Sequence, residues 1–196
     1  GEGLRPRGDG MVSVGTGRLA HTYSIVARDP STGEMGAAVQ SHWFSVGSVV
    51  TWGEAGVGVV ATQSLVNPAF GPGGLRLLRS GRSPEEAVRE MIEADEAREV
   101  RQLAVLDTSG RAFAFTGRRC IPKCGHITRD NLSVQANTMA SKEVWPAMAR
   151  AFEGTGGRLA ERMVAALEAA EGEGGDYRGR QSAALLVVKG TPSGRC

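Results

Sequence analysis

The chain has 196 residues, of which 41% are hydrophobic and 22% charged, and its formal net charge is +2. This composition is typical of one globular domain of ordinary size and excludes general disorder. Because the charge is nearly balanced, we expect neither nucleic acid nor a membrane surface as a partner.

The lack of recognisable targeting signals and the small number of cysteines lead us to expect a cytoplasmic protein. The sequence has no apolar stretch near the ~20 residues that span a bilayer, and its N-terminal segment lacks the apolar core of a secretory signal. Its three cysteines, Cys120, Cys124 and Cys196, are too few and too unevenly spaced for a disulfide framework. We therefore expect a cytoplasmic protein with a flexible arm over residues 1–20, one domain over 21–190 and a tail over 191–196.

The first elements form a predicted hairpin. Residues 22–27 are rich in β-branched side chains, and residues 35–41 are small and mostly apolar. Asp29, Pro30 and Gly33 between them are typical of a turn, so the two runs are expected to pair. An apolar run of this kind is typical of a strand covered on both faces. A second strand pair is expected within residues 45–50 and 56–62.

Two helices are expected next. The glycine-rich segment GPGG at 71–74 predicts a turn that leads into a short helix over 75–79. Ser83 is suited to cap a helix over 83–97, with Pro84 in the first helical position and Glu86 completing a capping box.

The second half of the chain repeats the grouping of strands and helices. Strands are predicted at 100–107, 111–116 and 132–136, helices at 141–152 and 159–170, and a last strand at 182–188. Helices grouped between strand hairpins favour a layered α+β sandwich over a doubly wound parallel sheet.

Several segments carry a family resemblance. They are TYSIVARDP at 22–30, AVQSHWF at 38–44, ATQS at 61–64, Asn67 with Pro68, Gly71, and VQAN at 134–137. In these segments and their order the chain resembles a bacterial family catalogued as domain of unknown function 1028, which is placed in the N-terminal-nucleophile (Ntn) hydrolase superfamily. The resemblance runs from about residue 22 to residue 188. It implies a four-layer αββα sandwich of antiparallel sheets and attaches no substrate.

The element order is also similar to that of proteasome β-type subunits. Their Thr-initiated strand corresponds here to Thr22, and the polar end of its hairpin partner to the triplet Gln40, Ser41 and His42. The Asp-containing loop before their last strand corresponds to Asp176. The sequence departs from that pattern at one point, since residues 45–57 contain no Lys.

Thr22 is the candidate nucleophile that this resemblance implies. An Ntn enzyme attacks with the side chain of its first residue and uses its own α-amine, with a reference pKa near ~8, as the base. Twenty-one residues precede Thr22 here, so its nitrogen lies in a peptide bond until processing frees it. The alternative is that Thr22 is an ordinary β-branched strand residue.

Side-chain amides supply candidate binding groups. Gln63, Ser64 and Asn67 follow a predicted buried strand, and Asn137 follows another. Amide groups can donate to an oxyanion or hold a substrate amide. For Asn67, which precedes a proline, turn formation is the alternative.

Two further polar residues complete the candidate site. Asp176 can anchor the amine of the nucleophile, or it is an ordinary turn residue. His42 can contact substrate, or it is a packed histidine at a strand end. We expect Gln63, Asn137 and Asp176 to share one pocket near Thr22.

No metal or cofactor is expected. Cys120, Cys124 and His126 form a single C-x3-C-x-H string, whereas zinc sites pair two such clusters. The GPGG segment lacks the Lys-Ser/Thr of a phosphate loop.

Two functions remain open at this point. The first is an Ntn amidohydrolase acting on a small amide or peptide-like substrate. The second is a catalytically silent Ntn-like domain that binds a small ligand or serves in assembly, with a homo-oligomer possible.

Overall fold

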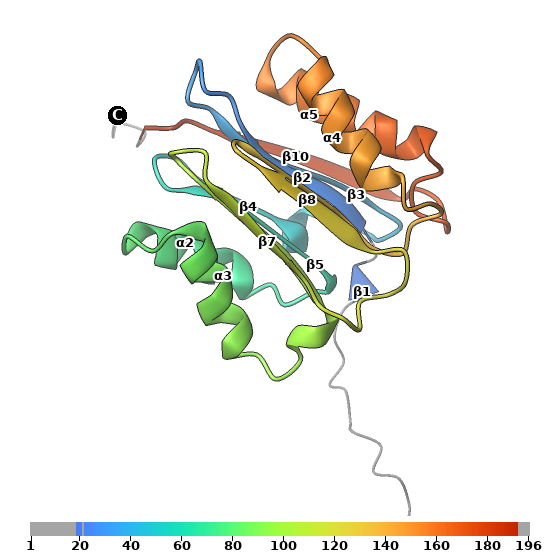
Figure 1. The fold of residues 1–196 in the computed structure, drawn as a ribbon, viewed down its shortest axis with the longest axis horizontal. Helices are drawn as coiled ribbons and strands as arrows, with labels where there is room; N and C mark the ends of the chain where they lie inside the picture. The colour runs from blue at the N-terminus through green and yellow to red at the C-terminus, as the bar shows by residue number, and fades with distance from the viewer. Residues whose placement is uncertain (1–18, 21, 192–196) are drawn as a thin grey trace, which may run out of the picture.

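A computed structural model describes residues 19–20 and 22–191, which form a mixed α+β fold with two antiparallel sheets (Figure 1). The strands of the first sheet are β1 (Leu19–Ala20), β4 (Thr51–Glu54), β5 (Gly58–Leu65), β6 (Arg101–Asp107) and β7 (Ala112–Thr116). The second sheet has the order β10-β3-β2-β9-β8, and its strands are β2 (Thr22–Arg28), β3 (Met35–Ser41), β8 (Gly125–Arg129), β9 (Leu132–Ala136) and β10 (Ser182–Val188).

The predicted first hairpin is confirmed. β2 and β3 pair antiparallel, with Thr22 opposite Ser41 and Arg28 opposite Met35. β3 is buried along its whole length, as its small apolar side chains predict. On its other edge β2 pairs with β9, so β2 is the central strand of its sheet.

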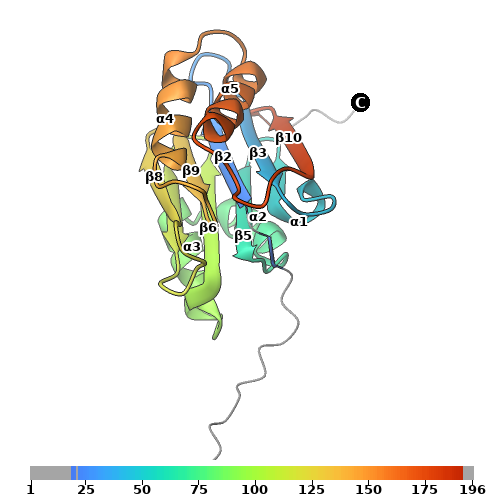
Figure 2. The same ribbon diagram turned by 90° about the vertical axis from the view of Figure 1, so that its right-hand side faces the viewer.

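Helices cover each sheet on the side away from the other sheet (Figures 1 and 2). α4 (Val144–Gly154) and α5 (Leu159–Gly172) pack on β2, β3 and β9, whereas α2 (Phe70–Arg79) and α3 (Pro84–Glu93) pack on β5, β6 and β7. Three apolar clusters result, two between a sheet and its helices and one between the two sheets.

The prediction of a strand at residues 45–50 is wrong. The structure has a short helix there, α1 (Gly47–Val50), and the strand that pairs with β5 is β4. Val46, Val49 and Val50 are buried, and their i, i+3, i+4 spacing suits one face of a helix. Ser45, with a φ of 53°, turns the chain into this helix.

The glycine-rich turn expected at residues 71–74 is also wrong, since this segment lies inside α2. A Cβ at Gly71 would lie 2.3 Å from the ring of Trp52, and one at Gly74 would lie 3.0 Å from Val60. The glycines therefore let the helix approach β4 and β5 closely, which a local reading cannot detect.

Other elements begin or end at residues that differ from the predicted bounds. α3 ends at Glu93 instead of residue 97, and a 3₁₀ turn η1 (Arg98–Val100) follows. The Asp95 carboxylate accepts from the backbone N–H of Ala97 and pairs with Arg101, which favours a turn at this point. Strand β8 was not predicted.

The last two residues of the expected N-terminal arm form a strand of the first sheet. Leu19 and Ala20 pair with Leu65 and Ser64 of β5. Residues 1–18 and 192–196, which hold most of the expected arm and tail, lie outside the described residues, as does His21. Among the described residues, no helix combines the length and the apolar character needed to cross a membrane.

The capping box at the start of α3 is confirmed. The Ser83 hydroxyl accepts from the backbone N–H of Glu86 at 3.3 Å, and the Glu86 carboxylate accepts from the backbone N–H of Ser83 at 2.8 Å. Both otherwise unpaired N–H groups at this helix end are thereby satisfied.

We predict that Ser83→Ala lowers the free energy of unfolding by about 0.5–2 kcal/mol, because an N-cap hydroxyl contributes that much. Urea denaturation measures the loss. Ser109→Ala, at an exposed position in the turn after β6, is the matched control. Equal stability of the two variants would show that the capping box contributes nothing.

Candidate functional site

The space between the two sheets is apolar at one end and polar at the other. Strand residues alternate between faces, so Val26 of β2 joins the apolar cluster between the sheets while Thr22 and Ser24 continue the same face toward the start of the strand. The same alternation places Gln63 of β5 on the face of the strand that also carries Ala61 of this cluster. The polar end is fully covered, because Thr22, Ser24 and Gln63 are each 0% exposed.

A chain of hydrogen bonds links the sheets at this polar end. Gln135 of β9 donates through Nε2 to the Ser24 hydroxyl at 2.7 Å, and that hydroxyl donates to Gln63 Oε1 at 2.6 Å. Gln63 Nε2 donates to Gln102 Oε1 of β6 at 2.6 Å. Asn137 Nδ2 donates to the same Gln102 oxygen at 3.0 Å. Buried amides are costly without partners, so these mutual bonds are what makes the polar end stable.

Thr22 lies beside this network. Its backbone carbonyl accepts from the Asn137 backbone N–H at 3.0 Å and from Gln63 Nε2 at 3.3 Å. Its hydroxyl donates to the Ser41 hydroxyl of β3 at 3.2 Å. The start of β2 is thus held by the neighbouring strands on both sides and by an amide from the opposite sheet.

The residues expected to share a pocket fall into two groups. Gln63 and Asn137 meet at Gln102 and at the Thr22 carbonyl. Asp176 is 4% exposed, and its carboxylate binds Arg178 through the guanidinium at 2.7 and 3.0 Å and through the backbone N–H at 3.0 Å. The hydrogen bonds of this carboxylate therefore stay within its own loop and do not reach the Thr22 network.

Ser64 and Asn67 lie at the end of β5 and in the loop after it. Ser64 is buried and has a φ of 71°, a left-handed conformation that is uncommon for a residue with a side chain. Asn67 Oδ1 accepts from the backbone N–H of Ala69 at 3.1 Å, and its carbonyl accepts from the backbone N–H of Phe70. Asn67 therefore forms the turn that starts α2, which is the turn alternative raised by the sequence.

His42 follows Ser41 at the end of β3. Its ring is partly buried, and Nδ1 is shielded from solvent without a hydrogen bond among the described residues. His42 is thus the next residue in the chain after Ser41, whose hydroxyl accepts from the Thr22 hydroxyl.

Sequence reasoning missed Gln102 and Gln135, and it set Ser24 aside as a poorer nucleophile than Thr22 because Ser24 lies inside the strand. Gln102 is the common acceptor for Gln63 and Asn137, and its own Nε2 donates to Thr116 Oγ1 at 2.9 Å and to the Ala136 carbonyl at 3.0 Å. A signal was available, because all five glutamines in the chain occur within or directly next to predicted strands.

The cysteine and histidine string makes hydrogen bonds to oxygen atoms. The Cys120 thiol donates to the Arg101 carbonyl at 3.1 Å, and His126 Nδ1 lies 2.8 Å from Thr116 Oγ1. Burial raises the pKa of both the Cys120 and the Cys124 thiol, and a protonated thiol is a poor metal ligand. The described residues contain no group of three or more His, Cys, Asp or Glu side chains suited to a metal ion.

We predict that Gln102→Met destabilises the protein by about 1–3 kcal/mol, because a buried donor left without its acceptor costs that much. Asn137 Nδ2 is the donor most affected. Urea denaturation is the measurement, and Gln181→Met, at an exposed glutamine, is expected to stay within about 0.5 kcal/mol of wild type. If both variants were equally stable, the network would have no role in stability.

We predict that elemental analysis of the purified protein finds no stoichiometric zinc. Raised thiol pKa values and hydrogen bonds to a carbonyl and a hydroxyl disfavour a thiolate site. One zinc per chain, lost in Cys124→Ser, would contradict this prediction.

Comparisons with known proteins identify a family but no activity. The profile of the family of unknown function DUF1028 matches residues 22–195. The crystal structure of protein SPO2555 from Silicibacter pomeroyi, also a DUF1028 protein, superposes with a TM-score of 0.81. The two chains are 37% identical, and the match covers 86% of this chain and 73% of that one. No curated protein matches the chain. The chain therefore belongs to the DUF1028 family, a family of unknown function.

Proposed function

We propose that this chain is an Ntn-type amidohydrolase with a four-layer αββα sandwich, acting on a small amide or peptide-like substrate. The observation that carries the proposal is the setting of Thr22. It is the first residue of the central strand β2, and its side chain faces the polar end of the space between the sheets. The two facing sheets with helices on their outer sides support the fold assignment.

The proposed reaction begins once the bond before Thr22 is cleaved. The free α-amine then takes the proton of the Thr22 hydroxyl as the oxygen attacks the substrate carbonyl. The tetrahedral intermediate collapses, the leaving amine accepts that proton, and an ester joins the acyl group to Thr22. Water then attacks the ester, which releases the acid and restores the hydroxyl and the amine.

Gln63 and Asn137 act in this proposal as positioning residues. They hold the Thr22 carbonyl at 3.3 and 3.0 Å, which fixes the backbone of the nucleophile. Ser41 lies next to the Thr22 hydroxyl. His42, one residue further on, is the candidate for substrate contact. Fixing a nucleophile before the substrate arrives lowers the entropic cost of the reaction.

A catalytically silent domain that binds a small ligand or serves in assembly is the second candidate. The observation that favours it is the completeness of the buried network. Gln63, Gln102 and Asn137 are each 0% exposed, and their amide groups bond to one another and to the backbone. A polar layer of this kind can serve structure alone.

We predict activity only in protein that begins at Thr22. Such protein is made as Met-Thr22, from which the methionine is trimmed, and intact mass confirms its first residue. Amine release from a panel of small amides and dipeptides is measured for this form, for the full chain and for the trimmed Thr22→Ala variant. The trimmed form should be active, and its rate should rise with pH through the amine pKa near ~8, because only the neutral amine accepts a proton.

The controls separate the two candidate functions. Equal rates for all three forms would remove Thr22 from the mechanism. An activated ester provides a second readout, since the trimmed form should gain one acyl group by mass and Thr22→Ala should not. Inactivity of the trimmed form on the whole panel, with no acyl adduct, would favour the silent domain.

A further inference from the structure

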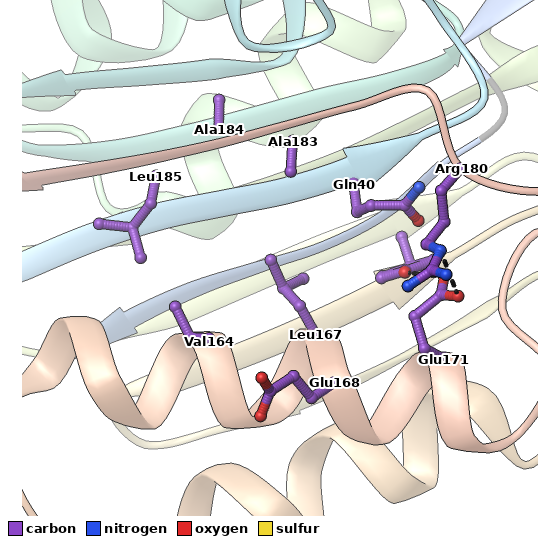
Figure 3. Close-up of a pocket in the computed structure, with 10 residues that line it drawn as sticks. Gln40, Val164, Leu167, Glu168, Glu171, Arg180, Ala183, Ala184 and Leu185 are labelled. Atoms are coloured by element: carbon purple, nitrogen blue, oxygen red, sulfur yellow. Dashed lines mark hydrogen bonds and ion pairs between the residues drawn. The ribbon is translucent and has the colours of Figure 1, made fainter.

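A second site lies on the other face of the same sheet. A cavity of about 360 Å³ opens between α5 and strands β3 and β10 (Figure 3). Its volume lies at the small end of the range of ligand pockets, roughly 300–1,000 Å³. Tyr23 and Gln40 line it, whereas their neighbours Thr22 and Ser41 face the opposite sheet, so the cavity is separate from the candidate active site.

The cavity has an apolar end and a polar end. Figure 3 shows Val164 and Leu185 at one end, Gln40, Glu171 and Arg180 at the other, and Leu167 between them. Val164 is 43% exposed and Leu185 40% exposed, which makes them two of the four large hydrophobic side chains exposed in the described part of the chain. The apolar wall is aliphatic and therefore suits a short hydrocarbon chain.

Arg180 and Glu171 at the polar end neutralise each other, and a third charged lining residue, Glu168, is exposed to solvent. Arg180 pairs with Glu171 at 3.5 Å, and the Tyr23 hydroxyl donates to the same carboxylate. The Arg180 side chain is 73% exposed. An exposed ion pair of this length holds a side chain weakly, so Arg180 can move aside to admit a ligand.

Gln40 is the group that these contacts leave unsatisfied. It is 6% exposed, and neither Nε2 nor Oε1 has a hydrogen-bond partner among the described residues. In Figure 3 its amide points toward Arg180, at the polar end of the cavity. A buried amide normally uses both its donor and its acceptor, so a neutral group that offers one of each is complementary to Gln40.

We propose that this cavity binds a small molecule with a primary carboxamide head and a short aliphatic chain. The ligand N–H donates to Gln40 Oε1, and its carbonyl accepts from Gln40 Nε2, a reciprocal pair that amides can form. The aliphatic chain lies along Val164, Leu167 and Leu185. The site binds its ligand without cleaving it and does not require a free Thr22.

An NMR titration of the full chain with hexanamide tests the site. Saturable shifts are expected at the backbone amides of Gln40, Leu167 and Leu185. Acetamide, which lacks the chain, and hexanoate, which lacks the amide donor, should bind at least tenfold more weakly. Because Thr22 is not an N-terminus in the full chain, the result is independent of the proposed hydrolysis.

Two variants and a control make the assignment specific. Gln40→Leu should weaken hexanamide binding at least tenfold while leaving Tm unchanged or higher, since it removes an unpaired buried amide. Leu185→Asp, at an exposed position, should also abolish binding and serves if Gln40→Leu does not fold. Gln181→Leu, at an exposed glutamine next to β10, should bind as wild type does.

Four results would overturn the proposal. They are the absence of saturable shifts at these residues, equal binding of hexanoate, unchanged hexanamide binding by Gln40→Leu, and shifts at the same residues that depend on protein concentration without hexanamide. The last result would mean that a second copy of the chain occupies the groove.

Discussion

The structure depends on the hydrogen bonds that Gln63 makes between the two sheets. Its amide accepts from Ser24 of the opposite sheet and donates to Gln102 of its own sheet and to the Thr22 carbonyl. A shift of β5 by one residue would turn Gln63 to the helix side and leave several buried groups without partners. These bonds therefore specify the register of β5 and the alignment of the sheets, whereas apolar packing alone tolerates many similar arrangements.

The space between the sheets has an apolar half and a polar half, and this division connects the fold with the proposed function. Its apolar half supplies the packing that holds the sheets together. Its polar half surrounds the start of β2, where Thr22 is bonded through its carbonyl and its hydroxyl. The opposite face of β2 and β3 carries Tyr23 and Gln40 toward α5, so adjacent residues of one hairpin face the two proposed sites on opposite sides of the sheet.

Local patterns predicted most elements correctly. The hairpin of β2 and β3, the capping box at Ser83, and strands β9 and β10 are confirmed. The errors come from contacts distant in sequence. The glycines within 71–74 lie in a helix that packs closely on the sheet, where side chains at Gly71 and Gly74 would collide with Trp52 and Val60. Gln63 and Asn137 were chosen as candidates because they directly follow predicted strands, whereas Gln102 meets them only through partners 35 and 39 residues away in the chain.

Native-state hydrogen exchange at the Asn137 backbone amide tests most directly whether the network holds Thr22 in place. This N–H donates to the Thr22 carbonyl, so its protection reports whether the start of β2 stays docked when the chain is cut before Thr22. In the trimmed protein we predict protection close to that of Val134 in the centre of β9. Exchange at the rate of a fraying terminus would contradict the account, because Thr22 would then not be held as a nucleophile requires.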